Sequence, residues 1–423
     1  MGLGLLGRGV GDARYLAECG ADLIVTDLKT REELLESVTQ LESFSNIQLV
    51  LGEHRLEDFK NRDFILKAAG VPLNSPYIAE AQKNDIPVRM SADLFAEISH
   101  IPIIGVTGTR GKSSVTYMIY SILKEAGKKV LLGGNVRGVS TLALLPEVTP
   151  EHIAVLELDS WQCQGWGDAK MSPHIAVFTT FYPDHLNYYK ENPEAYLADK
   201  ANIFLYQSAE DTLILGKQCA PLIIEKYGEN VEAKTLVVDE LKLPDTWTLQ
   251  IPGMHNRYDA ALALAAARAL AVPDEVSRIA LQSFTGVPGR LEFLREKNGI
   301  KIYNDSNATT PEATMAALAA LPVRQTILIM GGSDKELDMS ALLPMVQEHT
   351  KRTILLSGTG TDRIRGDLPD APVYDTLHTA VEDAVAHAAP GDSILLSPAF
   401  ASFGMFKNEY DRGDQFTALV QSL

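Results

Sequence analysis

The stretch TGTRGKSS carries residue types that bind phosphate. Gly108 and Gly111 allow backbone N–H groups to curl around phosphate oxygens, and the N-terminus of a following helix adds partial positive charge. Lys112 can reach the terminal phosphates, and the Ser113 hydroxyl can bind magnesium. Val106 stands where the usual GxxxxGK[ST] pattern has its first glycine, but strand, loop and helix follow in the required order. The stretch therefore predicts a loop that binds Mg-ATP.

Three further polar residues follow this loop. Glu157 ends the apolar strand in HIAVLELDSWQ, where a carboxylate beside a phosphate loop can hold a metal. His185 follows the strand of FTTF, and Lys200 lies on the predicted helix of YLADKANIF. The structural alternatives are a hydrogen-bonded histidine and an ordinary exposed lysine. Taken singly, these residues do not identify a reaction.

A second glycine-rich stretch, GLGLLG, begins at Gly2 and matches the GxGxxG pattern of dinucleotide-binding folds. Asp27 closes the strand LIVTD about twenty residues later, at the place of a ribose-binding acid. The glycines should follow a strand, and only Met1 precedes them. We therefore expect either that the genuine chain begins upstream or that this domain lacks its first strand. A nicotinamide cofactor is one alternative, and another nucleotide is the favoured one.

The elements that position these residues are short β-rich runs alternating with amphipathic helical stretches, a pattern typical of parallel sheets covered by helices. The pattern restarts twice. We expect an α/β fold of three domains, at residues 1–95, 96–286 and 287–423, with the phosphate loop in the second. The third carries three similar strand cores, TILIMGG, TILLSG and SILLSP.

Composition narrows the classes of function. The 423 residues include 38 Lys and Arg against 55 Asp and Glu, a net charge of −17 that argues against nucleic acid and anionic membranes as partners. Three cysteines, none in a CxxC pair, suggest neither a disulfide framework nor a zinc site. The longest apolar stretch, AALALAAARALAV, is too short to span a bilayer. We expect a cytoplasmic protein with no membrane insertion.

Nine motifs, in order along nearly the whole chain, resemble the Mur ligases of peptidoglycan synthesis. They are TGTRGKSS, GGN, ELDSWQ, PDH, GMHN, FTGVPGRLE, NDSNAT, GGSDK and SPAFASFGMFKNEYDRG. The pattern is most similar to the members that add D-glutamate to UDP-N-acetylmuramoyl-L-alanine. The resemblance implies a Rossmann-like UDP-binding first domain, a central P-loop ATPase domain, and a Rossmann-like C-terminal domain that binds the amino acid.

The resemblance also implies a reaction, in which an alanyl carboxylate attacks the γ-phosphate of ATP to form an acyl phosphate. The amine of the incoming amino acid then displaces phosphate and forms an amide. An anionic carboxylate must approach an anionic triphosphate, so Mg²⁺ and a lysine are needed between them.

By resemblance, four residues are catalytic: Lys112, Glu157, His185 and Lys200. Ser113 and Glu157 are implied to hold one magnesium ion, His185 with Glu157 a second, and Lys200 matches a lysine that carbon dioxide converts to a metal-stabilising carbamate. The implied ATP-binding residues are Gly108, Thr109, Arg110, Gly111, Lys112, Ser113, Ser114, Asn256 at the adenine, Arg290 at the phosphates and Asp305 at the ribose. The implied substrate-binding residues are Gly4, Leu5 and Leu6 for UDP, Asn135 and Gln162 for the muramyl part, and Lys335 and Ser402 for the amino acid.

Four positions depart from the family pattern. Asp159 replaces a serine, and Asp259 replaces the second asparagine of the HNxxN adenine motif. Asn307 stands where many members have lysine, and Glu409 where an aromatic residue follows FKN. The loss of a cation at Asn307 and the gain of an anion at Glu409 should weaken the binding of an acidic amino acid.

Several alternatives therefore stay open, among them a Mur-type ligase for a different amino acid and a noncatalytic nucleotide-binding regulator. A folate-type glutamate ligase shares the ATP domain but does not need a UDP-type first domain, and a Rossmann oxidoreductase would leave the P-loop unexplained. We expect a monomer.

Overall fold

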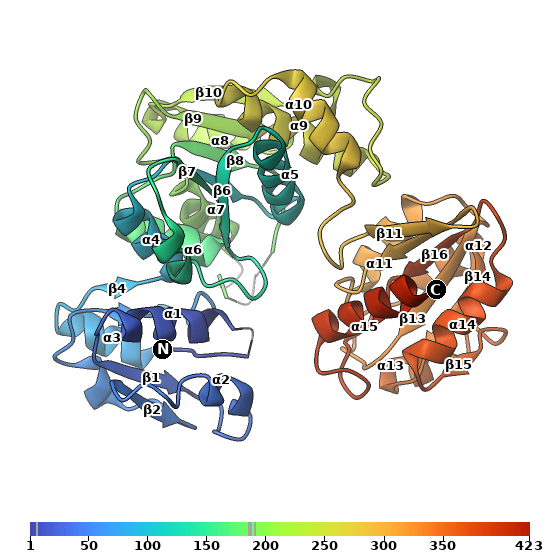
Figure 1. Cartoon of the computed structure of the whole chain (residues 1–423), viewed down its shortest axis with the longest axis horizontal. Helices are drawn as coiled ribbons and strands as arrows, with labels where there is room; N and C mark the ends of the chain where they lie inside the picture. Colours follow the sequence, from blue (N-terminus) through green and yellow to red (C-terminus); the bar gives the residue numbers. More distant parts are fainter. Residues whose placement is uncertain (6, 185–187, 190–191) are drawn as a thin grey trace. The chain divides into compact units, whose positions relative to one another are not determined.

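The computed structural model covers residues 1–423 and describes all of them except residues 6, 185–187 and 190–191. It confirms the predicted α/β class, since parallel sheets carry helices on their faces (Figure 1). The chain forms two compact units. The first comprises Met1–Asp245 and Tyr258–Leu281, and the second Thr246–Arg257 and Gln282–Leu423.

The N-terminal part of the first unit has two pairs of parallel strands. Its elements are α1 (Arg8–Glu18), β1 (Leu23–Asp27), α2 (Leu35–Thr39), β2 (Ile47–Leu51), the 3-10 helix η1 (Leu56–Phe59), β3 (Ile65–Leu66), α3 (Pro76–Lys83), β4 (Val88–Arg89) and α4 (Ser91–Ser99). β1 pairs with β2, and β3 with β4. The Gly2 N–H donates to the Thr26 carbonyl over 2.8 Å, and the Ala68 N–H donates to the Met1 carbonyl over 2.9 Å. The first two residues thus bridge the two pairs.

The rest of the first unit is built on a six-stranded parallel sheet with the order β10-β9-β8-β5-β7-β6. Its strands are β5 (Ile103–Thr107), β6 (Lys129–Gly134), β7 (His152–Glu157), β8 (Ile175–Phe178), β9 (Thr212–Gly216) and β10 (Lys234–Val238). Its helices include α5 (Lys112–Glu125), η2 (Leu142–Glu147), α6 (Ser160–Asp168), α7 (Pro193–Ala201), α8 (Ala220–Tyr227), η3 (Gly228–Asn230), η4 (Glu240–Lys242) and α10 (Asp274–Ser283). Strand β5 is central, and its apolar side chains are buried, as is usual where helices cover both faces of a parallel sheet.

Helix α9 (Met254–Ala269) contains most of the longest apolar stretch of the sequence. Ala260, Leu262, Ala263 and Leu264 are fully buried, so the stretch is a core helix. Within the described residues, no helix is both long and apolar enough to cross a membrane.

The second unit contains a sheet with the order β11-β12-β16-β13-β14-β15, in which only the β11 and β12 pair is antiparallel. Its elements are β11 (Glu292–Lys297), β12 (Ile300–Asn304), α11 (Pro311–Ala319), β13 (Thr326–Gly331), α12 (Leu342–His349), β14 (Thr350–Leu356), α13 (Thr359–Ile364), β15 (Val373–Tyr374), α14 (Leu377–His387), β16 (Ser393–Leu396) and α15 (Glu409–Ser422). The three predicted strand cores are β13, β14 and β16. Because β12, β16 and β13 are parallel neighbours, the loops after them lie at one edge of the sheet.

Candidate functional site

The predicted phosphate loop links β5 to α5. Gly108 has a φ of 141°, and a Cβ there would lie 2.0 Å from the Thr179 Oγ1 atom, so only glycine fits. Gly111, with a φ of 85°, is the N-cap of α5. The Lys112 ammonium donates to the carbonyls of Gly108 and Thr109 over 3.1 and 3.0 Å. The loop therefore has the glycine-dependent path and the internal lysine that a phosphate site requires.

Two threonines that directly follow β8 hold this loop in place. The Thr109 N–H donates to the Thr180 carbonyl over 2.7 Å, and the Arg110 N–H donates to the Thr180 hydroxyl over 3.0 Å. Thr179 and Thr180 were predicted only as strand residues, within FTTF. The sequence feature that could have indicated their role is a pair of hydroxyl residues at the end of an apolar strand.

Lys200, on α7, is almost completely buried against the phosphate loop. Its ammonium donates to the Gly108 carbonyl over 2.8 Å and to the Thr107 hydroxyl over 3.2 Å, and it lies 4.9 Å from the ring centroid of Tyr196. Burial, and secondly the charge of Lys112, lower the pKa of Lys200 to about 7. An ordinary exposed lysine is therefore excluded, and the side chain has the neutral-amine population that carbamylation needs.

Glu157 and Asn135, predicted separately for metal and substrate, lie in contact. The Asn135 side-chain amide donates to the Glu157 carboxylate over 3.2 Å, and its N–H donates to the Glu157 carbonyl over 2.7 Å. Arg8 donates to the Asn135 side-chain oxygen over 2.6 Å. Glu157 pairs in register with Val106 of β5, which places its carboxylate beside the strand that leads to the phosphate loop. Arg8 was not predicted, although it starts the helix after GLGLLG.

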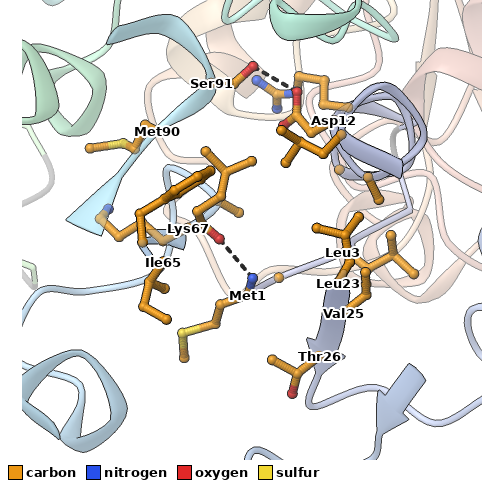
Figure 2. A pocket seen from close by; sticks show the side chains of 18 of the residues that line it. Met1, Leu3, Asp12, Leu23, Val25, Thr26, Ile65, Lys67, Met90 and Ser91 are labelled. Atoms are coloured by element: carbon orange, nitrogen blue, oxygen red, sulfur yellow. Dashed lines mark hydrogen bonds between the residues drawn. The ribbon is translucent and has the colours of Figure 1, made fainter. Parts of the chain in front are cut away.

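A cavity of about 700 Å³ lies in the N-terminal part of the first unit (Figure 2). Figure 2 shows Leu3 and β1 residues such as Leu23 and Val25 on one side, and Ile65 and Lys67 on another. Gly4 and Leu5 of the predicted UDP loop line it, as does Gln162, whereas Leu6 lies outside the described residues.

Two acids of this region have roles in organising the backbone and the hydroxyls. Asp27 accepts the N–H of Gly4 over 2.9 Å with one carboxylate oxygen, and the N–H of Lys29 over 2.9 Å with the other. Asp12 accepts the hydroxyls of Ser91 and Ser140, and burial raises its pKa. Asp27 thus holds the glycine-rich loop directly.

Asp159, a departure from the family pattern, is the N-cap of α6. Its carboxylate accepts the Gln162 N–H over 2.8 Å, and the Gln162 side chain accepts the Asp159 N–H over 3.1 Å. Aspartate caps helices as well as serine does, so the replacement preserves this reciprocal cap. The predicted substrate residue Gln162 is held in place by the same pair of bonds.

In the second unit, Asp305 is a buried anchor between two loops. It accepts the Leu291 N–H over 2.9 Å and the Ser397 hydroxyl over 2.7 Å. Burial raises the pKa of Asp305 to about 7, while these bonds and the charge of Arg290 oppose the rise. Asp305 and Arg290 are therefore close enough to interact.

The predicted amino-acid anchors lie after β13 and β16. The Lys335 ammonium donates to the Thr309 hydroxyl over 2.9 Å; Thr309, in the NDSNAT loop, was not predicted. Ser402 is buried, and its hydroxyl has no hydrogen-bond partner within the described part of the chain. A buried hydroxyl with unused bonding capacity is suited to receive a ligand.

A buried arginine connects the loops around these anchors. Arg412 is fully buried and donates to the carbonyls of Ser306, over 2.9 Å, and Phe400, over 3.3 Å. Glu409 begins α15 one turn earlier, and its charge raises the pKa of Arg412 against the lowering by burial. Asn307 donates to the Pro288 carbonyl over 3.3 Å. Arg412 was not predicted as a site residue, because the motif that contains it was used only to identify the resemblance to the family.

The remaining predicted residues have a mixed outcome. Asn256 lies in the first turn of α9, in the part of that helix that belongs to the second unit, and donates to the Pro252 carbonyl over 2.6 Å. Ser113 and Ser114 lie in the first turn of α5. His185 lies outside the described residues. Among the residues that the structure describes, no three His, Cys, Asp or Glu side chains form a group that could hold a metal.

Three family models match the chain. The Mur ligase MurD-like N-terminal domain matches residues 1–90, the Mur ligase middle domain residues 106–267, and the Mur ligase glutamate ligase domain residues 289–400. The UDP-N-acetylmuramoylalanine–D-glutamate ligase of Roseiflexus sp. (strain RS-1) is 36% identical over 460 residues, covering 100% of this chain and 97% of that protein. The ligase of the same name from Borreliella burgdorferi (strain ZS7) is 33% identical, with the same coverage.

Solved structures share the fold. The UDP-N-acetylmuramate–alanine ligase MurC from Thermotoga maritima superimposes with a TM-score of 0.60 at 17% identity, covering 100% of this chain and 98% of that one. E. coli FolC in complex with DHPP and ADP gives 0.57 at 18% identity, covering 78% and 92%. The predicted resemblance is confirmed over the whole length, and the chain belongs to the Mur ligase family.

Proposed function

We propose that this chain is an ATP-dependent ligase that adds D-glutamate to UDP-N-acetylmuramoyl-L-alanine in peptidoglycan synthesis. The observation that carries this function is the similarity, over the whole chain, to curated ligases of that name. The site supports it, because the phosphate loop, the buried Lys200 and the carboxylate of Glu157 all belong to one unit of the fold.

The reaction proceeds by activation of the alanyl carboxylate. Lys112, which donates to loop carbonyls here, turns to the terminal phosphates when ATP binds and offsets their charge. The carboxylate attacks the γ-phosphate, and ADP leaves. The amine of D-glutamate then attacks the acyl phosphate carbon, loses a proton and expels phosphate, which forms the amide.

Magnesium is the proposed cofactor, and the residues fit it. Magnesium prefers oxygen ligands and is commonly held by one or two carboxylates together with substrate phosphates, so a protein-only cluster is not required. The Glu157 carboxylate accepts from the neutral amide of Asn135, which leaves its negative charge for a cation. Ser113, Glu157, His185 and a Lys200 carbamate would hold magnesium, which would neutralise charge between the carboxylate and the triphosphate.

We assign each part of the substrates to a different group of residues. We assign UDP to the loop of Gly4, Leu5 and Leu6, the muramyl part to Asn135 with Gln162, and D-glutamate to Lys335 and Ser402. We also assign ATP-binding roles to Asn256, Arg290 and Asp305, which belong to the second unit. We further propose the domain limits 1–95, 96–286 and 287–423, a monomer, and a cytoplasmic location.

The test measures phosphate release and product mass with ATP, UDP-N-acetylmuramoyl-L-alanine and a panel of D- and L-amino acids. We expect release to require both the acceptor and an amino acid, with D-glutamate the best substrate, and to disappear in Lys112→Ala. Preference for L-glutamate, lysine or a neutral amino acid would overturn the substrate. Phosphate release without any amine would overturn the ligase function.

A further inference from the structure

Asp259, on helix α9, lies directly behind the phosphate loop. One of its carboxyl oxygens is only 2.5 Å from the point that a Cβ of Gly111 would occupy. Its second neighbour is Ser114, whose hydroxyl is a hydrogen-bond partner of the carboxyl group. Gly111 and Ser114 belong to the loop and first turn of α5, whose backbone N–H groups face a bound phosphate. Asp259 therefore contacts the part of the site that must keep its shape when ATP binds.

The surroundings of Asp259 favour an uncharged carboxyl group. The side chain is 4% exposed, and burial raises its pKa to about 8, although the bond with Ser114 opposes the rise. The cations on the loop and on the first turn of the helix packed against it are Arg110 and Lys112, and the Lys112 ammonium donates to two carbonyls of its own loop. On α9 the adjacent titratable group is Tyr258, whose phenol donates to a backbone carbonyl of the segment after β8.

We propose that Asp259 is a positioning residue for ATP, and that its carboxyl group acts as a neutral acid holding Gly111 and Ser114 in their binding conformation. A carboxylic acid presents one O–H donor and one C=O acceptor, as the amide of the asparagine in the family motif presents an N–H and a C=O. Ionised Asp259 would instead place a negative charge behind a loop that receives a triphosphate. The inference rests on the proposed use of ATP.

The test compares the dissociation constant for ATP, without turnover, in the wild-type protein and in Asp259→Asn between about pH 7 and about pH 9. Binding by the neutral form alone weakens with each pH unit above the pKa, so the wild-type protein should bind about tenfold more weakly at pH 9 than at pH 7. Asp259→Asn cannot ionise there and should keep one affinity throughout. It is also the matched control, because titration of ATP and of every other protein group is common to both proteins.

Two outcomes would overturn the proposal. The first is the same alkaline weakening in Asp259→Asn as in the wild-type protein, and the second is pH-independent binding by both. Infrared difference spectra give a second measurement on the folded wild-type protein: a protonated carboxyl band at pH 7 that is absent from Asp259→Asn is expected, and its absence from the wild-type protein would contradict the inference. If neither protein bound ATP at any pH, the proposed function would fail and the inference with it.

Discussion

Replacing Lys200 with alanine should nearly abolish ligation while leaving the phosphate loop able to form. The Lys200 ammonium contacts the Gly108 carbonyl and the Thr107 hydroxyl, but the path of the loop depends on its glycines and on bonds from the segment after β8. The loss should therefore appear in kcat for phosphate release. Removal of a side chain that only packs would instead lower stability and leave kcat of the folded fraction unchanged.

The magnitude follows from the pKa of Lys200, which burial and Lys112 lower to about 7. At pH 7.5 about three quarters of such amines are neutral, against about one in a thousand for a lysine of ordinary pKa. The neutral amine forms an N–C bond with carbon dioxide and releases a proton, so the cation becomes an anion. At neutral pH, Lys200 is therefore available for this reaction to a far larger extent than a lysine of ordinary pKa.

The assay measures initial rates of phosphate release after carbon dioxide is removed and after bicarbonate is restored, together with intact mass. We expect the wild-type protein to lose activity reversibly and to carry the mass of one carbon dioxide that Lys200→Ala lacks. A small carboxylic acid should partly rescue Lys200→Ala but not Lys200→Met, whose side chain fills the space. The exposed Lys217 gives a control, since Lys217→Ala should behave as the wild-type protein. Full activity of Lys200→Ala would refute the reasoning.

Three further outcomes are expected. Asn135→Ala removes the bond that links Arg8 to Glu157 and should raise the KM for UDP-N-acetylmuramoyl-L-alanine more than the KM for D-glutamate, measured by steady-state kinetics; an unchanged KM for the UDP substrate would count against this role. Glu409→Phe should fail to improve the use of D-glutamate, because it deprives the buried Arg412 of a nearby opposite charge, and improved kcat/KM for D-glutamate would show that Glu409 faces the amino acid. Leu156→Ala, at a fully buried position near the end of β7, should lower the free energy of unfolding by about 2–5 kcal/mol in urea denaturation, and a loss well below that would mean that the core refills the cavity.

The strand, loop and helix around Lys112 were predictable because these residues are contiguous in sequence. A strand, two glycines, a lysine and a helix suffice to place Lys112 and Ser113, since each position constrains the next through backbone geometry. Thr180 and Arg8 were not predictable in this way. Each joins the site through a partner more than sixty residues away in the sequence, Thr180 to Arg110 and Arg8 to Asn135. Contacts of that kind depend on the order of the strands in the sheet, which local patterns do not specify.

Besides contacts between distant residues, the burial of individual side chains could not be predicted from the sequence. The residues around Lys200 in the sequence could equally surround an exposed lysine on a helix. Lys200 is buried because the phosphate loop packs against it. The boundaries of the compact units also depend on packing. Alternating strands and helices predicted the parallel sheets, whereas the division of the chain at Tyr258, within α9, follows from three-dimensional packing.

The four departures from the family pattern show why charge read along a sequence is an incomplete guide to binding. Asp159 replaces a serine of the family pattern, and its carboxylate caps α6. Asp259 replaces an asparagine, and burial favours its neutral form. Glu409 lies one helical turn from the buried Arg412, so its charge has a counterpart inside the protein. A helix cap accounts for Asp159, burial for Asp259 and a nearby buried cation for Glu409. Asn307 remains as a true loss of a cation. We therefore propose that recognition of an acidic amino acid depends on Lys335, whose ammonium donates to the Thr309 hydroxyl.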